Sequence, residues 1–241
     1  MLDARRREVW NNLQPFASNH YYPDKAGAFT PEEIEGVDKW VDSLLGLQAE
    51  AVEKAVRKIE FSSRAKYKGS ETYFNVSVSG TQSSYADICM MLESLHLRAG
   101  QKVIDLGSGY GRMGFVIGDK YPDVFFKGYE IVDARRAESS RVAQSWGWQN
   151  VSYETRDLGD VNFTPDVADV YFMYDPANNP TTEKILKDLR KVAEKRAIRI
   201  VAVDGTGRLS RMLPGRPWLK KQQTAAANYA KFPIVLYSAG A

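Results

Sequence analysis

The sequence contains very little cysteine or histidine. Cys89 is the only cysteine in 241 residues, and His20 and His96 are the only histidines. A single cysteine cannot form an intramolecular disulfide, and two isolated histidines give no metal-binding cluster, so we expect neither a disulfide framework nor a metal site. Cys89 lies in the apolar run 88–92, which predicts a buried, unreactive thiol.

Long apolar runs are also missing. No stretch approaches the roughly 18 uninterrupted apolar residues of a membrane span, and residues 1–8 are charged where a secretory signal would be apolar. We therefore expect no membrane association and a cytoplasmic location. The net charge of +3 and the pI near 8.8 are mildly basic, which allows an anionic partner without requiring one.

The chain divides into a charged helical extension, residues 1–70, and a main domain, residues 71–241. Thr30, Pro31 and Glu33 have the spacing of a helix start with a capping box, and apolar residues recur at helical spacing from 37 to 59. Two interpretations of the extension stay open, a helical cap on the domain and an element that selects the substrate. Residues 72–84 are polar with interspersed aromatics, as in a linker or a lid.

From residue 85 onward, predicted helices and strands alternate. The helices are expected at 85–97, 112–121, 134–146 and 181–195, and the strands at 102–106, 124–130, 151–154, 167–174 and 198–204. Two further strands are expected at 217–224 and 233–238. This alternation predicts an α/β fold, a Rossmann-like, doubly wound and mostly parallel sheet that finishes with an antiparallel C-terminal strand.

A glycine-rich turn follows the first strand of this domain. Asp105 ends the strand, and Gly107, Gly109 and Gly111 alternate in the turn before a helix begins at Arg112. Glycines let the backbone approach a ligand closely. We expect free amide groups of the turn and the positive end of the helix dipole to face that ligand.

The next strands supply two more acidic residues. Glu130 ends the strand 124–130, nineteen residues after Gly111, where a carboxylate can accept hydrogen bonds from both ribose hydroxyls of a nucleoside. Asp157 follows the third strand and could accept from an adenine amino group. An ordinary loop aspartate is the other interpretation of Asp157.

The glycine turn is compatible with two cofactors. The run 109–114 fits the Gly-x-Gly-x-x-Gly pattern of NAD sites in a shifted register, but there the first glycine usually follows the strand directly, whereas here Asp105 and Gly107 come first. A carboxylate in the turn would repel a pyrophosphate and would suit the cationic amino group of S-adenosylmethionine (SAM). The sequence therefore favours SAM over NAD.

The runs 105–112 (Asp-Leu-Gly-Ser-Gly-Tyr-Gly-Arg), 128–130 (Gly-Tyr-Glu) and 174–176 (Tyr-Asp-Pro) resemble the successive motifs of class I SAM-dependent methyltransferases. The resemblance covers about residues 80–205. It implies SAM as the cofactor, with Asp105 near the methionine amino group and Gly107 and Gly109 lining the turn. It also implies that Glu130 holds the ribose and Asp157 the adenine.

A narrower resemblance is to the non-SET protein-lysine methyltransferases. It is carried by the helix 85–97, by the Gly-Tyr-Glu run and by the helix 181–195. It implies a protein lysine as the methyl acceptor, and we add Tyr85 and Gly111 to the expected cofactor contacts. The sequence departs from this family at 175–180, and residues 1–70 lie outside the resemblance.

The acceptor site is expected at the end of the fourth strand, where Tyr174 and Asp175 are the candidate catalytic residues for orienting the acceptor. Packing in the core is the other interpretation of Tyr174. Ala177 and Asn178 depart from the Asn/Asp-Pro-Pro-aromatic signature of adenine or glutamine N-methylation, so a nucleic-acid acceptor is possible but not favoured. A small-molecule acceptor and a non-catalytic SAM- or NAD-binding protein stay open as alternatives.

A basic segment near the C-terminus has two interpretations. Between residues 205 and 221 five cationic residues occur without an acidic one, namely Arg208, Arg211, Arg216, Lys220 and Lys221. The segment could bind RNA or an acidic peptide. It could equally be solvated loop charge.

Overall fold

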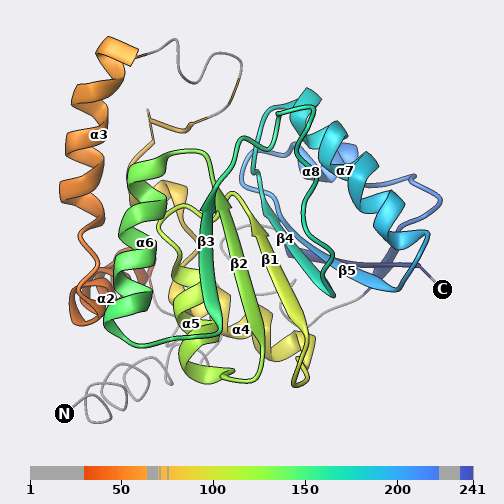
Figure 1. The fold of residues 1–241 in the computed structure, drawn as a ribbon, viewed down its shortest axis with the longest axis horizontal. Coiled ribbons are helices and arrows are strands. Elements are labelled where there is room, and N and C mark those ends of the chain that lie inside the picture. Colours follow the sequence, from red (N-terminus) through yellow and green to blue (C-terminus); the bar gives the residue numbers. More distant parts are fainter. Residues whose placement is uncertain (1–29, 64–69, 71, 75, 223–233, 241) are drawn as a thin grey trace.

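The structure is a computed structural model that describes residues 30–63, 70, 72–74, 76–222 and 234–240. These residues build a seven-stranded sheet of order β3-β2-β1-β4-β5-β7-β6, much of which is visible in Figure 1. Neighbouring strands pair in parallel except β7, which is antiparallel to β5 and β6. The strands are β1 (Lys102–Leu106), β2 (Phe125–Glu130), β3 (Val151–Thr155), β4 (Val170–Tyr174), β5 (Ile198–Val203), β6 (Lys220–Gln222) and β7 (Ile234–Ala239).

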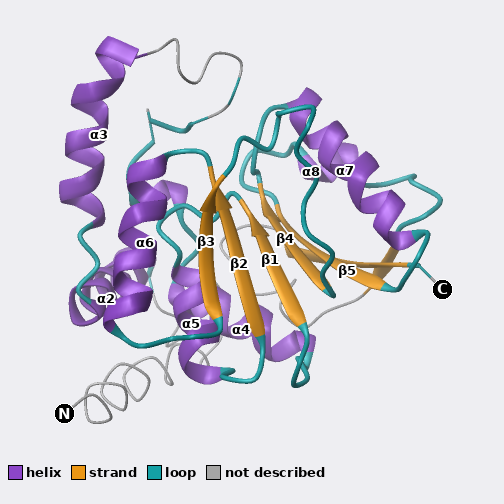
Figure 2. Ribbon diagram, in the orientation of Figure 1, coloured by secondary structure: helices purple, strands orange, loops and turns teal. Residues whose placement is uncertain are grey.

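Helices cover both faces of the sheet (Figure 2). One apolar cluster joins one face to α4, α5 and α6, and a second cluster joins the other face to α7 and α8. None of the described helices has the length and apolar character needed to cross a membrane. The helices are α2 (Pro31–Leu45), α3 (Ala49–Ser63), the single 3-10 turn η1 (Ser79–Thr81), α4 (Tyr85–Leu95), α5 (Arg112–Lys120), α6 (Asp133–Ser145), α7 (Asn179–Ala193) and α8 (Leu209–Met212).

The described part of the extension contains two helices, α2 and α3, within the stretch where apolar residues recur at helical spacing. The capping box is present, since the Thr30 hydroxyl accepts from the amide of Glu33 and the Glu33 carboxylate accepts from the amide of Thr30. The first helix ends because Gly46 adopts a left-handed φ of 75°, and α3 begins at Ala49. Apolar periodicity alone did not reveal this break, because both helices keep an apolar face on the same core.

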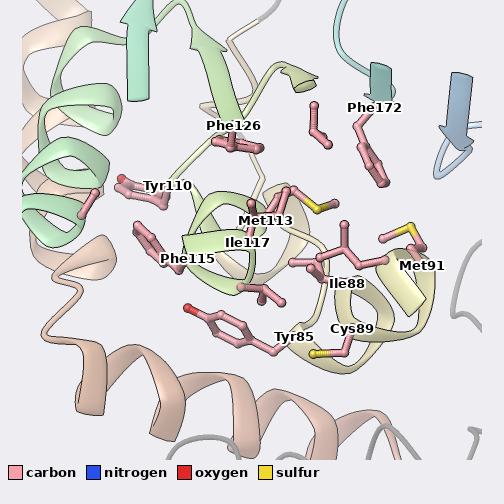
Figure 3. Packing of buried hydrophobic residues seen from close by; sticks show 14 of the residues in the cluster. Tyr85, Ile88, Cys89, Met91, Tyr110, Met113, Phe115, Ile117, Phe126 and Phe172 are labelled. Carbon is pink, nitrogen blue, oxygen red and sulfur yellow. The ribbon is translucent and has the colours of Figure 1, made fainter. Parts of the chain in front are cut away.

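The core between the sheet and α4 and α5 is built from large side chains (Figure 3). Tyr85, Ile88 and Cys89 of α4 lie in this cluster with Phe115 of α5, and each is at most 1% exposed. Cys89 is a free thiol whose pKa is raised to about 11 by burial, which fits the predicted unreactive cysteine. The strands β1, β4 and β5 are buried on both faces, as expected of central parallel strands.

Candidate cofactor and acceptor site

A cavity of about 260 Å³ lies where the parallel strands β1 to β5 end at their carboxyl termini. This edge of an open α/β sheet is the usual ligand position. Residues 70, 72–73, 76 and 80–81 line the remaining wall. They belong to the lid segment, our name for the described residues between 70 and 84, most of which lie in the stretch 72–84 expected to be a linker or a lid. The lining includes Ser70, Thr72, Tyr73, Val76, Gly80, Thr81, Gly107, Gly109, Glu130, Ile131, Arg135, Arg156, Asp157, Leu158, Tyr174, Asp175, Pro176, Gly205 and Thr206.

The glycine turn after β1 is held by its own hydrogen bonds. The amides of Gly107 and Ser108 both donate to the carbonyl of Tyr129, and the amide of Gly111 donates to the carbonyl of Ser108. The amide of Gly109 donates to Glu130 Oε2 at 2.9 Å. Our expectation that these amides would face a ligand was therefore wrong, because three of them attach the turn to the end of β2 and the fourth, that of Gly111, closes the turn on Ser108.

Two glycines of the turn bring its backbone close to the other walls of the cavity. A Cβ on Gly107 would stand 3.3 Å from the Cβ of Pro176, and Gly107 has a φ of 95°. A Cβ on Gly109 would stand 3.5 Å from the carbonyl oxygen of Thr81, at a φ of 52°. Both glycines line the cavity, which is where the sequence placed them. A larger residue at either position would narrow the cavity and strain the backbone.

Glu130 sits at the centre of the cavity wall. Its Oε2 accepts from the amide of Gly109 and its Oε1 from the amide of Val132, each at 2.9 Å. Burial raises the pKa of this carboxyl, while Arg135, 3.9 Å away, and the two amides act in the opposite direction. Each oxygen keeps a lone pair, so the fixed carboxylate can still accept two ligand hydroxyls.

Asp157 lines the cavity beyond β3, next to Leu158. Its Oδ2 accepts from the Ser70 hydroxyl at 2.7 Å, and its Oδ1 accepts from the amide of Gly159 at 2.8 Å. The Ser70 contact attaches the end of the N-terminal region to this wall. Asp157 therefore lines the cavity, and both of its oxygens already accept from a protein donor.

Asp105 faces a second, smaller cavity of about 40 Å³ that adjoins the first. Thr81, Gly107 and Tyr174 line both cavities, so the two share a boundary. Burial, and then the charge of Glu130, raise the pKa of Asp105 from an ordinary 3.8 to about 7. The ionised form of Asp105 is unfavourable in this site, and a cationic ligand group next to it would stabilise that form. Asp105 is therefore suited to a cationic ligand group.

Two predicted cofactor contacts lie elsewhere. Tyr85 is fully buried in the core, and its hydroxyl donates to Asp42 of α2 at 2.8 Å, so it does not line the cavity (Figure 3). Gly111 is the N-cap of α5 at a φ of 86° and is covered by Tyr153, whose hydroxyl donates to the Gly111 carbonyl. These two residues belong to the scaffold beneath the site. They were assigned to the cofactor because the sequence alone does not distinguish a glycine at a helix start, or a packed tyrosine ring, from a ligand contact.

The acceptor end of the cavity is formed where β4 ends. Asp175 has a left-handed φ of 38°, and its Oδ2 accepts from the amide of Thr206 at 2.8 Å. Its buried Oδ1 has no hydrogen-bond partner among the residues that the structure describes. Burial, and then the charge of Asp204, raise the pKa of Asp175. Tyr174 lines both cavities, and the Tyr73 hydroxyl donates to the Asp175 carbonyl.

Several residues of the site were not found from the sequence. Arg135 of α6 donates to Glu53 of α3 through Nε and Nη2 and to the Thr72 carbonyl through Nη1, and it lines the cavity. Tyr73 reaches the acceptor end from the lid segment. Neither contact has a sequence signal, because the first depends on how α3 packs against α6 and the second on how residues 72–74 pack against the end of β4.

The described residues hold no group of three or more His, Cys, Asp or Glu side chains arranged for a metal ion. No family model matches the chain, and no curated protein matches its sequence.

Solved structures share the fold. TrmN from Thermus thermophilus is similar with a TM-score of 0.51 and 15% identity, over 68% of this chain and 51% of that protein. A SAM-dependent methyltransferase from Aquifex aeolicus is similar with a TM-score of 0.49 and 14% identity, over 78% of this chain and 97% of that one. The chain thus spans about half the length of TrmN. Together with the strand order, the likeness to TrmN confirms the predicted Rossmann-like fold.

Proposed function

We propose that the chain is a SAM-dependent methyltransferase that transfers a methyl group to an amine, with a protein lysine as the acceptor. The observation that carries the proposal is a single cavity with a braced carboxylate, Glu130, on one wall and a buried carboxylate with an unpartnered oxygen, Asp175, on another. Glu130 is suited to the hydroxyls of a nucleoside, and Asp175 is suited to an N–H donor of an acceptor that lies beside that nucleoside.

The residues of the turn fit SAM better than NAD. A dinucleotide turn offers free amides to the pyrophosphate, whereas Gly107, Ser108, Gly109 and Gly111 all use their amides within the protein. Asp105, close by, would repel a pyrophosphate. In this arrangement Glu130 would hold the ribose, Asp157 and Leu158 would lie beside the adenine, and the glycine turn would lie along the methionine part.

The charge around the two cavities favours a cationic acceptor over a polyanion. The lining carries four carboxylates and three arginines, and each arginine is paired with a carboxylate outside the lining. Nucleic-acid binding relies on cations that are free to neutralise phosphates. The lining carboxylates are Asp105, Glu130, Asp157 and Asp175, and the arginines are Arg112 with Asp42, Arg135 with Glu53, and Arg156 with Glu154.

The basic segment 205–221 adds little to a nucleic-acid alternative. Arg208 donates to the carbonyl of Ala177, and Arg216 is paired with Glu183. Arg211, Lys220 and Lys221 are exposed. Because Arg208 and Arg216 already have partners within the protein, we interpret the segment as structural and solvated charge. We do not interpret it as a dedicated phosphate-binding surface.

When bound, SAM supplies an activated methyl group on a sulfonium, so the chain has only to present the acceptor. The lysine nitrogen must first lose a proton, and transfer into a site with little water lowers the pKa of an amine. Asp175 Oδ1 then accepts one remaining N–H and directs the nitrogen lone pair along the cavity. Bound there, SAM would supply the electrophilic methyl group in line with this nitrogen and would leave as S-adenosylhomocysteine. Such alignment can itself contribute about 7–11 kcal/mol.

The test is incubation of the full chain with methyl-labelled SAM and fractionated cell extract. We expect label in protein, on lysine after acid hydrolysis, and we expect Asp175→Asn to reduce it by roughly 100-fold or more, as for other groups that position a reacting atom. Asp166→Asn, at an exposed carboxylate paired with Lys127, is the matched control. Label in RNA or in small molecules would contradict the lysine assignment, and an absence of SAM binding would contradict the proposed activity.

A further inference from the structure

The smaller cavity contains polar atoms that the protein leaves without partners. Gln82 Oε1 and Ser108 Oγ are both shielded from solvent and make no hydrogen bond to any residue that the structure describes. Gln82 is 9% exposed, and it lines this cavity together with Asp105 and Ser108. Unpartnered buried acceptors are costly, because a polar group removed from water without a replacement partner loses its hydrogen bonds to water.

The amide of Gln82 has a defined orientation. Its Nε2 donates to the carbonyl of Val78 at 3.5 Å. Reversing the amide would set Oε1 against that carbonyl oxygen, so Oε1 is the end left without a partner. Gln82 also lies over the glycine turn, since its Cγ would be 3.9 Å from a Cβ on Gly109. The lid segment therefore holds an acceptor directly above the turn after β1.

The cavity suits a small cationic donor. It has room for a group about the size of one water molecule. Asp105, Gln82 and Ser108 line it, and Gln82 Oε1 and Ser108 Oγ are buried acceptors without a partner among the described residues. Arg112 lines the same cavity, but its charge is met by Asp38 at 3.0 Å and Asp42 at 2.5 Å. An ammonium group has three N–H donors and would satisfy these acceptors together.

We propose that Gln82 is a cofactor-binding residue that accepts a hydrogen bond, through Oε1, from the methionine ammonium of SAM beside Asp105. The inference rests on the proposed function, because it assigns one end of the same ligand. It makes the lid segment a part of the cofactor site, whereas the glycine-turn motif alone assigns only residues after β1. Recognition of the amino-acid end would then depend on a residue that precedes the motif by more than twenty positions.

The test compares three ligands by calorimetry on the full chain: S-adenosylhomocysteine, decarboxylated SAM and methylthioadenosine. The first two carry the ammonium group and the third lacks it, while all three share the adenosine. We expect Gln82→Met to weaken the first two by about ten- to a hundredfold, the loss of one hydrogen bond to a charged group. Methylthioadenosine should bind unchanged, which also shows that the variant is folded. Gln144→Met, at an exposed position of α6, is the matched control.

Each other outcome overturns the inference. If all three ligands weaken equally, Gln82 acts on the adenosine or on the fold. If none weakens, Oε1 makes no contact with the ligand. If decarboxylated SAM keeps its affinity while S-adenosylhomocysteine loses it, Gln82 serves the carboxylate. If the unaltered chain binds none of the three, the proposed function fails with the inference, so the two failures are distinguishable.

Discussion

Replacing Asp105 by asparagine should make the unliganded protein more stable at high pH. In the unfolded chain this carboxyl ionises near its ordinary pKa of 3.8, whereas in the folded protein burial and the charge of Glu130 raise the pKa to about 7. Between these pH values the folded state holds a proton that the unfolded state has released. Folding stability therefore falls as the pH rises through this window, and the loss is complete above about pH 7.

The size of the effect follows from the same shift. A tenfold change in an ionisation equilibrium is worth about 1.4 kcal/mol, so a rise from 3.8 to about 7 sets a ceiling of about 4 kcal/mol. Asp105 keeps partial contact with solvent, and solvent weakens such electrostatic effects, so we expect roughly half of this ceiling, about 2 kcal/mol. Asparagine is neutral at every pH, so the variant does not lose the stability that ionisation of a buried carboxyl costs.

Urea unfolding at several pH values measures this difference. We expect Asp105→Asn to exceed the unaltered chain by about 2 kcal/mol at pH 8 and the gap to narrow towards pH 5. Asp123→Asn, at an exposed turn, reports the effect of removing a surface charge. A gap that does not change with pH, or a variant less stable at pH 8, would refute the account of Asp105.

The same substitution should act in the opposite sense on ligand binding. A bound ammonium group favours the ionised form of Asp105, so the unaltered chain must release a proton to bind ligand below about pH 7. Its affinity for S-adenosylhomocysteine should therefore rise from pH 6 to pH 8, and the asparagine variant should bind more weakly without this rise. Calorimetry in two buffers of different protonation enthalpy also measures the released proton.

Four further substitutions test the scaffold by urea unfolding. Gly111→Ala should cost roughly 3 kcal/mol, since φ is 86° and the new Cβ would stand 2.6 Å from the Tyr153 hydroxyl oxygen. Gly147→Ala, with a φ of 70° and open space around it, should cost only about 1 kcal/mol, and equal costs would contradict the contact with Tyr153. Arg135→Met should cost about 3 kcal/mol, because Glu53 loses its buried guanidinium partner and keeps only the Tyr110 hydroxyl and the more exposed Arg57 at 3.6 Å. Adding Glu53→Met should recover part of that loss, and strict additivity of the two costs would argue against a coupled pair.

The alternation of elements in the main domain was predictable because each strand is short, apolar and bounded by turn residues. The strand 102–106 was predicted with its observed bounds, and the other predicted helices and strands between residues 85 and 204 differ from the structure by a few residues at their ends. The short helix α8 was missed, because a four-residue helix in a basic segment has no periodicity to detect. The break at Gly46 was also missed, because the apolar residues keep helical spacing on both sides of it.

The site was predictable where short motifs at the ends of neighbouring parallel strands determine it. Glu130 and the glycine turn meet because parallel pairing of β1 and β2 sets Asp105 beside Gly128, which fixes their positions from the strand register alone. The roles of Tyr73, Gln82 and Arg135 depend on how the lid segment and α3 pack onto the domain. These contacts join residues far apart in the chain through buried polar groups, and no local pattern encodes such pairings.

The helices α2 and α3 contact the site through ion pairs as well as through apolar packing. On α2, Asp38 and Asp42 pair with Arg112 at the start of α5, directly after the glycine turn. On α3, Glu53 pairs with Arg135, the arginine that lies 3.9 Å from Glu130.

Removing charges from water costs several kcal/mol for each ion, so buried pairs of this kind add less to stability than apolar packing would. Their effect is to fix where the partners lie. Without Glu53, the guanidinium of Arg135 would be left with Glu130 as its nearest carboxylate and would compete with the ribose hydroxyls for it. We therefore infer that the extension, whatever it does for the acceptor, keeps the cofactor carboxylate available.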